Sequence, residues 1–470
     1  MLRDYQHAML DGARNSLARH KRILLVAPTG AGKTVLALEM IRGAVARGKR
    51  VLFLCHRREL VRQSSRAFWN AGVPHGMVMA GKGMSLTPAN VGVINTVINR
   101  IDRMQAPDLI IVDEAHRSVS PSYMDVFAAW PNATVVGLTA TPARTDGRGL
   151  AEAGYTDIVQ GPPPRWLINA GYLSDYRLIA PASALSMDGV HIRAGDYATD
   201  ELERAVDRPT ITGDAVRAYT QFAAGKRCMV FCVTVKHSQH VCDQYNAAGI
   251  PAEHIDGTHS DTERDAVLAR FRAGTTLVVT SVQLAIEGLD IPAIEAIQFL
   301  RPTASVIVYL QAIGRGLRRE AGKSECVILD QVANFYRHGW PDDEREWTLD
   351  GRKTRQRGQH EPPPLNVRQC KQCFTVYRPT VPACPSCGKL HDVARDSPNV
   401  VDGELIEIDP ETVRREQKRE QGGARTMRDL VELGKRRNMN KPAEWAASVF
   451  AARHGRKPAP ADYAQARAFL

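Results

Sequence analysis

The sequence lacks any run of about 18 or more apolar residues, so no segment is long enough to cross a bilayer as a helix. Its first residues, MLRDYQHAML, also lack the apolar core of a secretion signal. We therefore expect a cytoplasmic protein without a membrane partner. Disulfides are rare in that compartment, so the nine cysteines are expected to be thiols or metal ligands.

The length and composition describe a multidomain globular protein. A chain of 470 residues indicates about three domains, and 44% apolar with 24% charged residues is typical of a folded protein. A net charge of +11 favours an anionic partner such as nucleic acid, although a merely basic surface would have the same composition.

Apolar runs alternate with helical patterns twice along the chain, which predicts two α/β domains with doubly wound parallel sheets. No tight sequence repeat links them, and residues 143–224, which are less regular, are expected to bridge them. The predicted strands are 23–27, 51–55, 109–114, 135–140, 229–233, 276–281 and 326–330, and the predicted helices include 34–46, 59–71, 238–248 and 262–271.

After residue 340 the composition becomes charged and proline-rich, which predicts a linker followed by smaller modules. Two short amphipathic helices are expected at the end of the chain, with apolar positions at Met427, Leu430, Val431, Trp445, Val449 and Phe450. The predicted parts are a first α/β domain (1–170), a second (171–340), a linker (341–365), a cysteine module (366–392), a polar linker (393–425) and a helical tail (426–470).

The segment APTGAGKT (27–34) follows a predicted strand and precedes a predicted helix, as the phosphate-binding P-loop GxxxxGK[ST] does. It departs from that pattern only at Ala27, in the first glycine position. The backbone of such a loop faces the phosphates, so we expect nucleotide contacts along residues Thr29, Gly30, Ala31, Gly32, Lys33 and Thr34. Lys33 is expected to reach the β- and γ-phosphates of ATP and Thr34 to bind Mg²⁺. The alternative is a chance glycine-rich turn.

The segment DEAH (113–116) ends a predicted strand about 80 residues later, where an acid linked to the metal is expected. Asp113 would hold Mg²⁺ through water, and Glu114 would orient the attacking water. The alternative is a strand end with solvated acids. His116 is also a catalytic candidate, although histidines at strand ends are often structural.

The segment QAIGRGLR (311–318) brings arginines from a distant part of the chain. If GRGLRR begins a helix, Arg315 and Arg318 share one face, which suits the charge that develops on a γ-phosphate. Alone, this segment would be read as a basic surface.

Four cysteines, Cys370, Cys373, Cys384 and Cys387, have the spacing CxxC–x10–CxxC. This spacing predicts a closed, structural Zn²⁺ site of four thiolates, with two unrelated redox pairs as the alternative. The module is expected to present Lys371, Arg378 and Lys389 to nucleic acid. The other five lie in apolar segments and are expected to be buried thiols: Cys55, Cys228, Cys232, Cys242 and Cys326.

Taken in order, these motifs resemble those of superfamily 2 helicases of the DEAD/DEAH-box type, over residues 2–319. The resemblance implies two tandem RecA-like domains and a catalytic role for Gln311 beside the two arginines. LRDYQ is similar to the Q motif, which implies that Gln6, with Arg3 nearby, contacts adenine. HRREL (56–60) and LTATP (138–142) resemble motifs Ia and III, which implies that Thr139 and Thr141 couple hydrolysis to movement.

The same resemblance implies nucleic-acid contacts at Arg58, Thr96 and Thr280, and nucleotide contacts at Gly288 and Asp290 in TSVQLAIEGLDIP (280–292). Within the superfamily, residues 300–318 followed by a cysteine module resemble the RadD-type bacterial DNA repair helicases and related phage helicases. The closing segment KPAEWAASVFAARHGRKP looks like the short helical tail of phage and prophage helicases.

These expectations predict an ATP-dependent DNA helicase or translocase that uses ATP, Mg²⁺ and a structural Zn²⁺ and acts in repair, recombination or phage replication. Binding to single-stranded or forked DNA is expected to be largely independent of sequence and sensitive to salt. A single-strand-binding, repair or replication protein is an expected partner. The alternatives are a duplex translocase without unwinding, an RNA helicase, and an ATP-binding zinc adaptor that does not turn over.

Overall fold

The computed structural model describes residues 2–83, 87–144, 146–181, 192–193, 196–197, 209–282, 294–350, 367–390, 418–424, 426–437, 441–454, 456 and 458–459. The chain forms two compact units, Met1–His391 and Asp392–Leu470. Within the described residues, no helix is both long and apolar enough to span a membrane.

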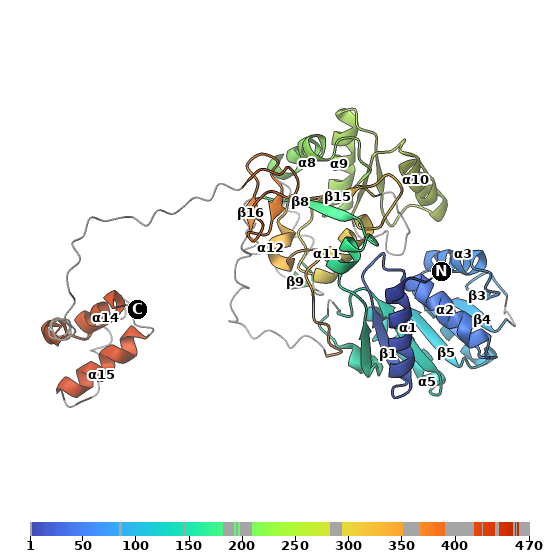
Figure 1. The fold of residues 1–470 in the computed structure, drawn as a ribbon, viewed down its shortest axis with the longest axis horizontal. Helices are drawn as coiled ribbons and strands as arrows, with labels where there is room; N and C mark the ends of the chain where they lie inside the picture. The colour runs from blue at the N-terminus through green and yellow to red at the C-terminus, as the bar shows by residue number, and fades with distance from the viewer. Residues whose placement is uncertain are drawn as a thin grey trace. The chain divides into compact units, whose positions relative to one another are not determined.

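The first unit begins with a parallel sheet of seven strands in the order β3-β4-β2-β5-β6-β1-β7 (Figure 1). Side chains that alternate along β1 enter two different hydrophobic clusters, Ile23 and Leu25 on one face and Leu24 and Val26 on the other, so both faces of the sheet are buried. The strands are β1 (Arg22–Val26), β2 (Val51–Cys55), β3 (Gly76–Val78), β4 (Ala89–Val93), β5 (Leu109–Asp113), β6 (Thr134–Thr139) and β7 (Asp157–Gln160). The helices are α1 (Asp4–Leu17), α2 (Lys33–Val45), α3 (Arg58–Asn70), α4 (Ile94–Ile98), α5 (Pro121–Ala129) and α6 (Pro164–Asn169).

A second parallel sheet of six strands has the order β12-β13-β11-β14-β15-β8. Its strands are β8 (Asp175–Ile179), β11 (Cys228–Phe231), β12 (Ala252–Ile255), β13 (Val278–Ser281), β14 (Ala296–Phe299) and β15 (Glu325–Asp330). Its helices are α8 (Pro209–Phe222), α9 (Val235–Ala247), α10 (Asp261–Ala273), α11 (Val306–Gly316) and α12 (Asn334–His338). The two doubly wound domains are therefore confirmed.

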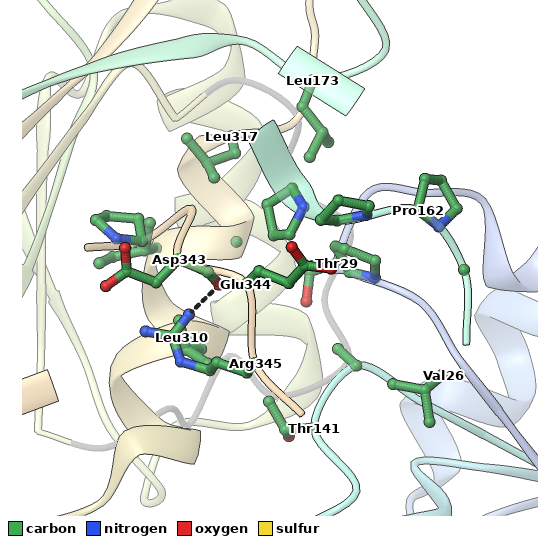
Figure 2. A pocket seen from close by; sticks show the side chains of 18 of the residues that line it. Val26, Thr29, Thr141, Pro162, Leu173, Leu310, Leu317, Asp343, Glu344 and Arg345 are labelled. Carbon is green, nitrogen blue, oxygen red and sulfur yellow. Dashed lines mark hydrogen bonds between the residues drawn. The ribbon is translucent and has the colours of Figure 1, made fainter. Parts of the chain in front are cut away.

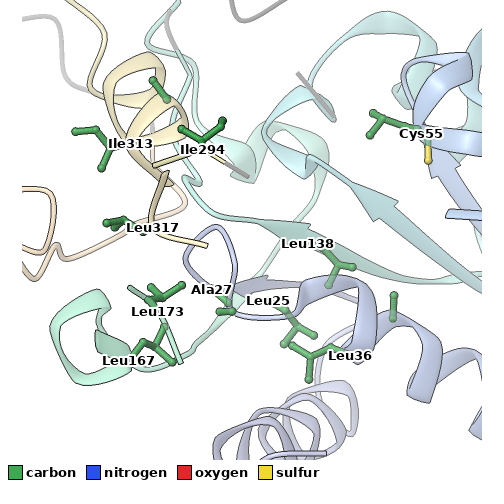
Figure 3. Close-up of a cluster of buried hydrophobic side chains, with 14 of the residues drawn as sticks. Leu25, Ala27, Leu36, Cys55, Leu138, Leu167, Leu173, Ile294, Ile313 and Leu317 are labelled. Carbon is green, nitrogen blue, oxygen red and sulfur yellow. The ribbon is translucent and has the colours of Figure 1, made fainter. Parts of the chain in front are cut away.

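The bridging region contributes one strand to each sheet. β7 pairs with β1 at the edge of the first sheet, and β8 pairs with β15 at the edge of the second. A single apolar cluster continues between the domains, where Ala27, Leu173, Ile313 and Leu317 approach one another (Figure 3). Both sheets thus share one core beside the P-loop.

The described part of the predicted linker, residues 341–350, packs against both domains, and we call it the strap. Trp347 and Leu349 pack against the core of the first domain, and the Ala151 N–H donates to the Leu349 carbonyl at 3.0 Å. At the other end, the buried Asp342 carboxylate accepts from Arg165 and, at 2.5 Å, from the Tyr176 hydroxyl. This part of the chain is therefore anchored rather than solvated, which its charged composition did not indicate.

The cysteine module contains β16 (Arg368–Gln369) and β17 (Val376–Tyr377), which pair antiparallel. The second unit contains α14 (Met427–Arg436) and α15 (Pro442–His454). Thr426 caps α14, because its hydroxyl accepts from the Asp429 N–H while the Asp429 carboxylate accepts from the Thr426 N–H. The predicted apolar positions form the core between these helices, which buries Met427, Leu430, Val431 and Phe450, with Trp445 and Val449 packed beside them.

Candidate ATP site between two domains

The P-loop lies between the end of β1 and the start of α2. Gly30 and Gly32 have φ values of 88° and 82°, a region that costs little only for glycine, and Gly32 is the N-cap of α2. Ala27, which replaces the first glycine of the pattern, is not among the described residues with positive φ, so its methyl group is tolerated there. The loop therefore has the backbone that a phosphate-binding turn needs.

Lys33 begins α2, and its ammonium donates to the carbonyls of Ala27 at 3.1 Å and Pro28 at 3.4 Å. Burial lowers the pKa of Lys33, and the nearby carboxylates of Glu114 and Asp113 partly oppose that shift. A half-buried ammonium held beside an anion-binding loop suits the β- and γ-phosphates of a nucleotide.

Asp113 ends β5, and Glu114 follows it with a left-handed backbone at φ 50°. Burial and the charge of Glu114 raise the pKa of Asp113 to about 7. Burial also raises the pKa of Glu114, but His116 and nearby cations outweigh it and leave that pKa at about 2. Two adjacent, half-buried carboxylates, one of them with a raised pKa, are a donor set that Mg²⁺ fits, because a divalent cation stabilises the charged form of both.

Arg315 reaches this site from the second domain. It lies in the last turn of α11, is 7% exposed, and helps lower the pKa values of both Glu114 and Lys33. Arg318 also acts on Lys33 but lies beyond the end of α11. The segment therefore ends a helix rather than beginning one, and the prediction that the two arginines share a helical face is wrong. Gly314 explains the close approach, because a side chain there would lie 2.6 Å from Thr29 Cβ.

The predicted adenine contacts lie against the same loop. The Gln6 amide donates to the Ala31 carbonyl at 3.3 Å, and its oxygen accepts from the Arg3 N–H at 3.0 Å. The Tyr5 hydroxyl donates to the Ala31 carbonyl at 2.8 Å. The Arg3 guanidinium lies 4.5 Å from the centroid of the Tyr172 ring.

An aromatic wall stands beside these residues and is missing from the predictions made from the sequence. The ring of Trp166 lies 5.9 Å from that of Tyr5 and 6.0 Å from that of Tyr172. Trp166 and Tyr172 lie about 160 residues after the Q motif, so no local spacing signal connects them to it.

Comparisons with known proteins agree with this geometry. Residues 1–144 match the family of the type III restriction enzyme res subunit, and residues 213–320 match the helicase conserved C-terminal domain. A 51.5 kDa protein of a Lactococcus phage (isolate 7-9) is 31% identical over 371 residues, which cover 78% of each chain. The chain belongs to the superfamily 2 helicases. It is an ATP hydrolase of that class.

Two further similarities cover the same region of the helicase. A Schizosaccharomyces pombe protein named as a mitochondrial ATP-dependent helicase, irc3, is 30% identical over 348 residues, covering 70% of this chain and 57% of that protein. The DNA-bound structure of the type ISP restriction-modification enzyme LlaBIII superposes with a TM-score of 0.53 at 19% identity. That match covers 71% of this chain and 28% of the other and shows a common fold.

Residues of the DEAH segment and of the LTATP segment lie in contact across the helicase site. His116 Nδ1 lies 3.4 Å from both the Glu114 carboxylate and the Thr139 hydroxyl. The Thr139 hydroxyl donates to the Thr141 carbonyl and accepts from the Thr141 N–H, both at 3.1 Å. Glu114 is therefore connected through His116 to the loop after β6, where the coupling threonines were predicted.

A cavity of about 70 Å³ separates this loop from α11. Figure 2 shows side chains of the P-loop region, of α11 and of the strap around it, with the Arg345 guanidinium donating to the Asp343 carbonyl at 2.9 Å. The Thr141 hydroxyl is buried in this region and has no partner among the described residues. The residues that line the cavity include Val26, Thr29, Thr141, Leu310, Gly314 and Trp347.

The predicted nucleic-acid contacts differ in their accessibility. Arg58 is exposed at the start of α3, and Thr96 is half-buried on α4. Thr280 is fully buried and donates to the Ser238 carbonyl at 3.0 Å, so its side chain offers no surface to nucleic acid in this conformation. The predicted nucleotide contacts at Gly288 and Asp290 lie outside the described residues, and Gln311 is buried on α11.

The four module cysteines converge, with all their sulfur atoms within 4.8 Å of one another. Cys370 and Cys387 Sγ atoms are 3.6 Å apart, and those of Cys373 and Cys384 are 3.4 Å apart. Tetrahedral Zn²⁺ with bonds of about 2.3 Å would place sulfurs about 3.8 Å apart, so the donor set fits a structural zinc ion. The other five cysteines are buried, as predicted.

The module is fastened to the second motor domain. The Arg378 guanidinium lies 4.9 Å from the centroid of the Trp340 ring and pairs with Asp342 at 3.2 Å and Asp343 at 2.9 Å. Arg378 is therefore engaged with Trp340 and the strap but stays exposed, as Lys371 and Lys389 do, so the prediction that the three contact nucleic acid stays a prediction.

We predict one zinc ion per chain, lost on Cys384→Ser substitution, because a thiolate ligand is removed. Metal content measured by atomic absorption tests this, with Cys242→Ser, a cysteine on α9, as the matched control. Wild-type protein purified without chelators that contains no zinc, or a disulfide between module cysteines, would contradict the assignment.

Proposed function

We propose that this helicase hydrolyses ATP to move along DNA, tracking the phosphate backbone without regard to sequence. The observation that carries the proposal is Arg315, which the second domain supplies to the Lys33–Glu114 site of the first. A site assembled from two domains favours the closed arrangement when ATP is bound and loses that preference on hydrolysis. Each turnover then changes the spacing of two surfaces that grip the strand.

We propose the following residue roles, which the geometry supports. Lys33 would hold the β- and γ-phosphates, Glu114 would orient the attacking water, and Arg315 with Arg318 would stabilise the charge developing on the γ-phosphate. Thr34 and Asp113 would hold Mg²⁺, which would neutralise charge on the phosphates.

The adenine ring is assigned to the surface formed by Gln6, Arg3 and the Tyr172 ring. The Gln6 amide, now bonded to the Ala31 carbonyl and the Arg3 N–H, would bond the edge of the base instead, and the aromatic wall would offer a stacking face. Arg3 already lies over the Tyr172 ring, so a bound base would replace or extend an existing cation–π contact.

DNA is favoured over RNA because a restriction-enzyme family model matches the first domain and a solved structure of similar fold is bound to DNA. The phage relative and the helical tail support a role in phage replication, DNA repair or recombination, with a single-strand-binding or repair protein as a partner. Unwinding, rather than translocation alone, is part of the proposal.

The test is the rate of ATP hydrolysis with single-stranded DNA, forked DNA, blunt duplex and RNA of matched length. We expect stimulation chiefly by single-stranded and forked DNA, falling steeply between low and physiological salt because the contacts are to phosphates. Stimulation by blunt duplex alone would indicate a duplex translocase, and stimulation by RNA alone would indicate an RNA helicase. No stimulated turnover would overturn the proposal and leave a nucleic-acid adaptor.

A further inference from the structure

The two zinc knuckles have the same backbone but different residues at their tightest point. In the second knuckle, CPSCG, the Gly388 N–H donates to the Cys384 carbonyl at 2.9 Å, and Gly388 has φ 72°. In the first, CKQCF, the Phe374 N–H donates to the Cys370 carbonyl at the same distance, and Phe374 has φ 59°. A bulky side chain is rare in this region of φ, where glycine is the residue without strain.

The side chain of Phe374 is not buried, so hydrophobic burial does not offset this backbone strain. It is 42% exposed, and one edge contact with Phe222 of α8, at 6.0 Å between ring centroids, covers only part of it. Strained backbone maintained under an exposed aromatic side chain is typical of a functional position. The ring is therefore available as a surface for a ligand.

Phe374 and Phe222 line a pocket of about 330 Å³ between the module and the second motor domain, a size within the range of ligand sites. The pocket lies at the carboxyl ends of β8 and β15, the edge of a parallel sheet where ligands commonly bind. Figure 1 shows β16 beside β8, α8 and α12, and the Ile179–Thr375 bridge and the Gln369 bond to the Ala180 carbonyl join the module to this edge.

This pocket is separate from the ATP site. α11 begins after the carboxyl end of β14 and ends before the start of β15, so Arg315 in its last turn lies toward the amino ends of the strands. The pocket lies toward the opposite ends of the same sheet. A ligand there would not touch the nucleotide.

The polar groups around the pocket suit a planar ligand with hydrogen-bonding edges. Gln221, Gln331 and Gln369 bring side-chain amides, and Arg217 is exposed at the rim, with Lys371 exposed in the same knuckle as Phe374. The acid in the wall, Asp330, accepts the Phe335 N–H at 2.7 Å and serves the turn before α12. Aromatic rings, amides and nearby cations are the groups that bind unpaired bases of nucleic acids.

We propose that Phe374 stacks on one unpaired nucleobase, which enters this pocket from the single strand that the motor binds. The inference rests on the proposed function, because the strand must reach the carboxyl edge of the second sheet. It gives the zinc module a direct role in holding the strand. It also explains why the first knuckle has phenylalanine where glycine would be unstrained.

The test is the affinity of the full-length protein for a fluorescein-labelled single-stranded oligonucleotide, measured by anisotropy. Phe374→Gly removes the ring but suits the positive φ, so zinc content and melting temperature are expected to stay at or above those of the wild type. The dissociation constant is expected to rise about 5- to 140-fold, because stacking contributes about 1–3 kcal/mol per base. Phe374→Tyr keeps the ring and is expected to bind normally, as is Leu390→Ala, which removes another exposed apolar side chain of the module.

Blunt duplex is the control ligand, because its bases are paired and the Gly variant is expected to bind it as the wild type does. Unchanged single-strand affinity of Phe374→Gly, or an equal loss with duplex, would overturn the inference. If Phe374→Gly lost affinity for an apolar peptide but not for single-stranded DNA, the inference would also be overturned, and the pocket would be assigned to a protein partner. If nucleic acid does not stimulate ATP hydrolysis by the wild-type protein, the proposed function is refuted. The binding measurement is independent of that result, because it does not require ATP hydrolysis.

Discussion

Lys33→Ala is expected to reduce ATP hydrolysis about 100- to 1,000-fold, because it removes a cation placed to stabilise charge on the transferred phosphoryl group. In the structure its ammonium bonds only to the carbonyls of Ala27 and Pro28 among the described residues, so the fold has little dependence on it. Burial already disfavours the charged form of Lys33, and that cost disappears in the variant. Steady-state hydrolysis and thermal unfolding measured on the same samples test both halves of this expectation.

The matched control for this change is Lys49→Ala, since Lys49 is exposed and pairs with Asp108 on the surface. Its rate is expected to equal that of the wild type. If Lys33→Ala retains turnover while remaining folded, the P-loop assignment is wrong. If it unfolds, the assumption that the lysine has no structural role is wrong.

Arg315→Ala is expected to lower the rate of hydrolysis by about 1,000-fold or more, because an arginine supplied to the γ-phosphate has an effect of that size. ATP binding is expected to change far less, since the P-loop residues remain intact. The result separates catalysis from binding and tests whether the second domain acts on ATP held by the first. Hydrolysis at saturating ATP and titration with a fluorescent ATP analogue are the two readouts.

Arg319 offers a control of the same residue type only four positions away. It is exposed and bonds to the Gly171 carbonyl instead of contributing to the Lys33–Glu114 site. Arg319→Ala is expected to retain wild-type hydrolysis. Equal losses in the two variants would mean that the segment acts through folding and that Arg315 has no special position.

The parts of the site that are contiguous in sequence could be predicted, because short chemical patterns specify them. Asp113 ends an apolar strand, Glu114 follows it, and Lys33 begins the helix after the loop that follows β1, while β6 pairs with both of these strands. β14 was not predicted because it contains a buried polar residue, Gln298. Its amide is satisfied by the Ala215 carbonyl at 2.9 Å and the Tyr245 hydroxyl at 2.5 Å.

Features that depend on distant contacts were not predictable in this way. Nothing in the charged segment 341–350 indicates that Asp342 is buried by Arg165 and Tyr176 or that Trp347 packs on the first domain. GRGLRR was considered as a helix start because the sequence has no strong stop signal there, whereas α11 ends in this segment, where Lys323 donates to the carbonyls of Gly316 and Arg318. These contacts join residues from separate elements, so local patterns do not contain them.

The central claim is that one ATP site, built from two domains, turns over in response to a nucleic-acid strand. The most direct measurement is the rate of ATP hydrolysis by wild-type protein with and without single-stranded DNA, at low and at physiological salt. We predict a large stimulation at low salt that declines as salt rises, and none in Arg315→Ala. A rate that is the same with and without nucleic acid at both salt concentrations would contradict the account.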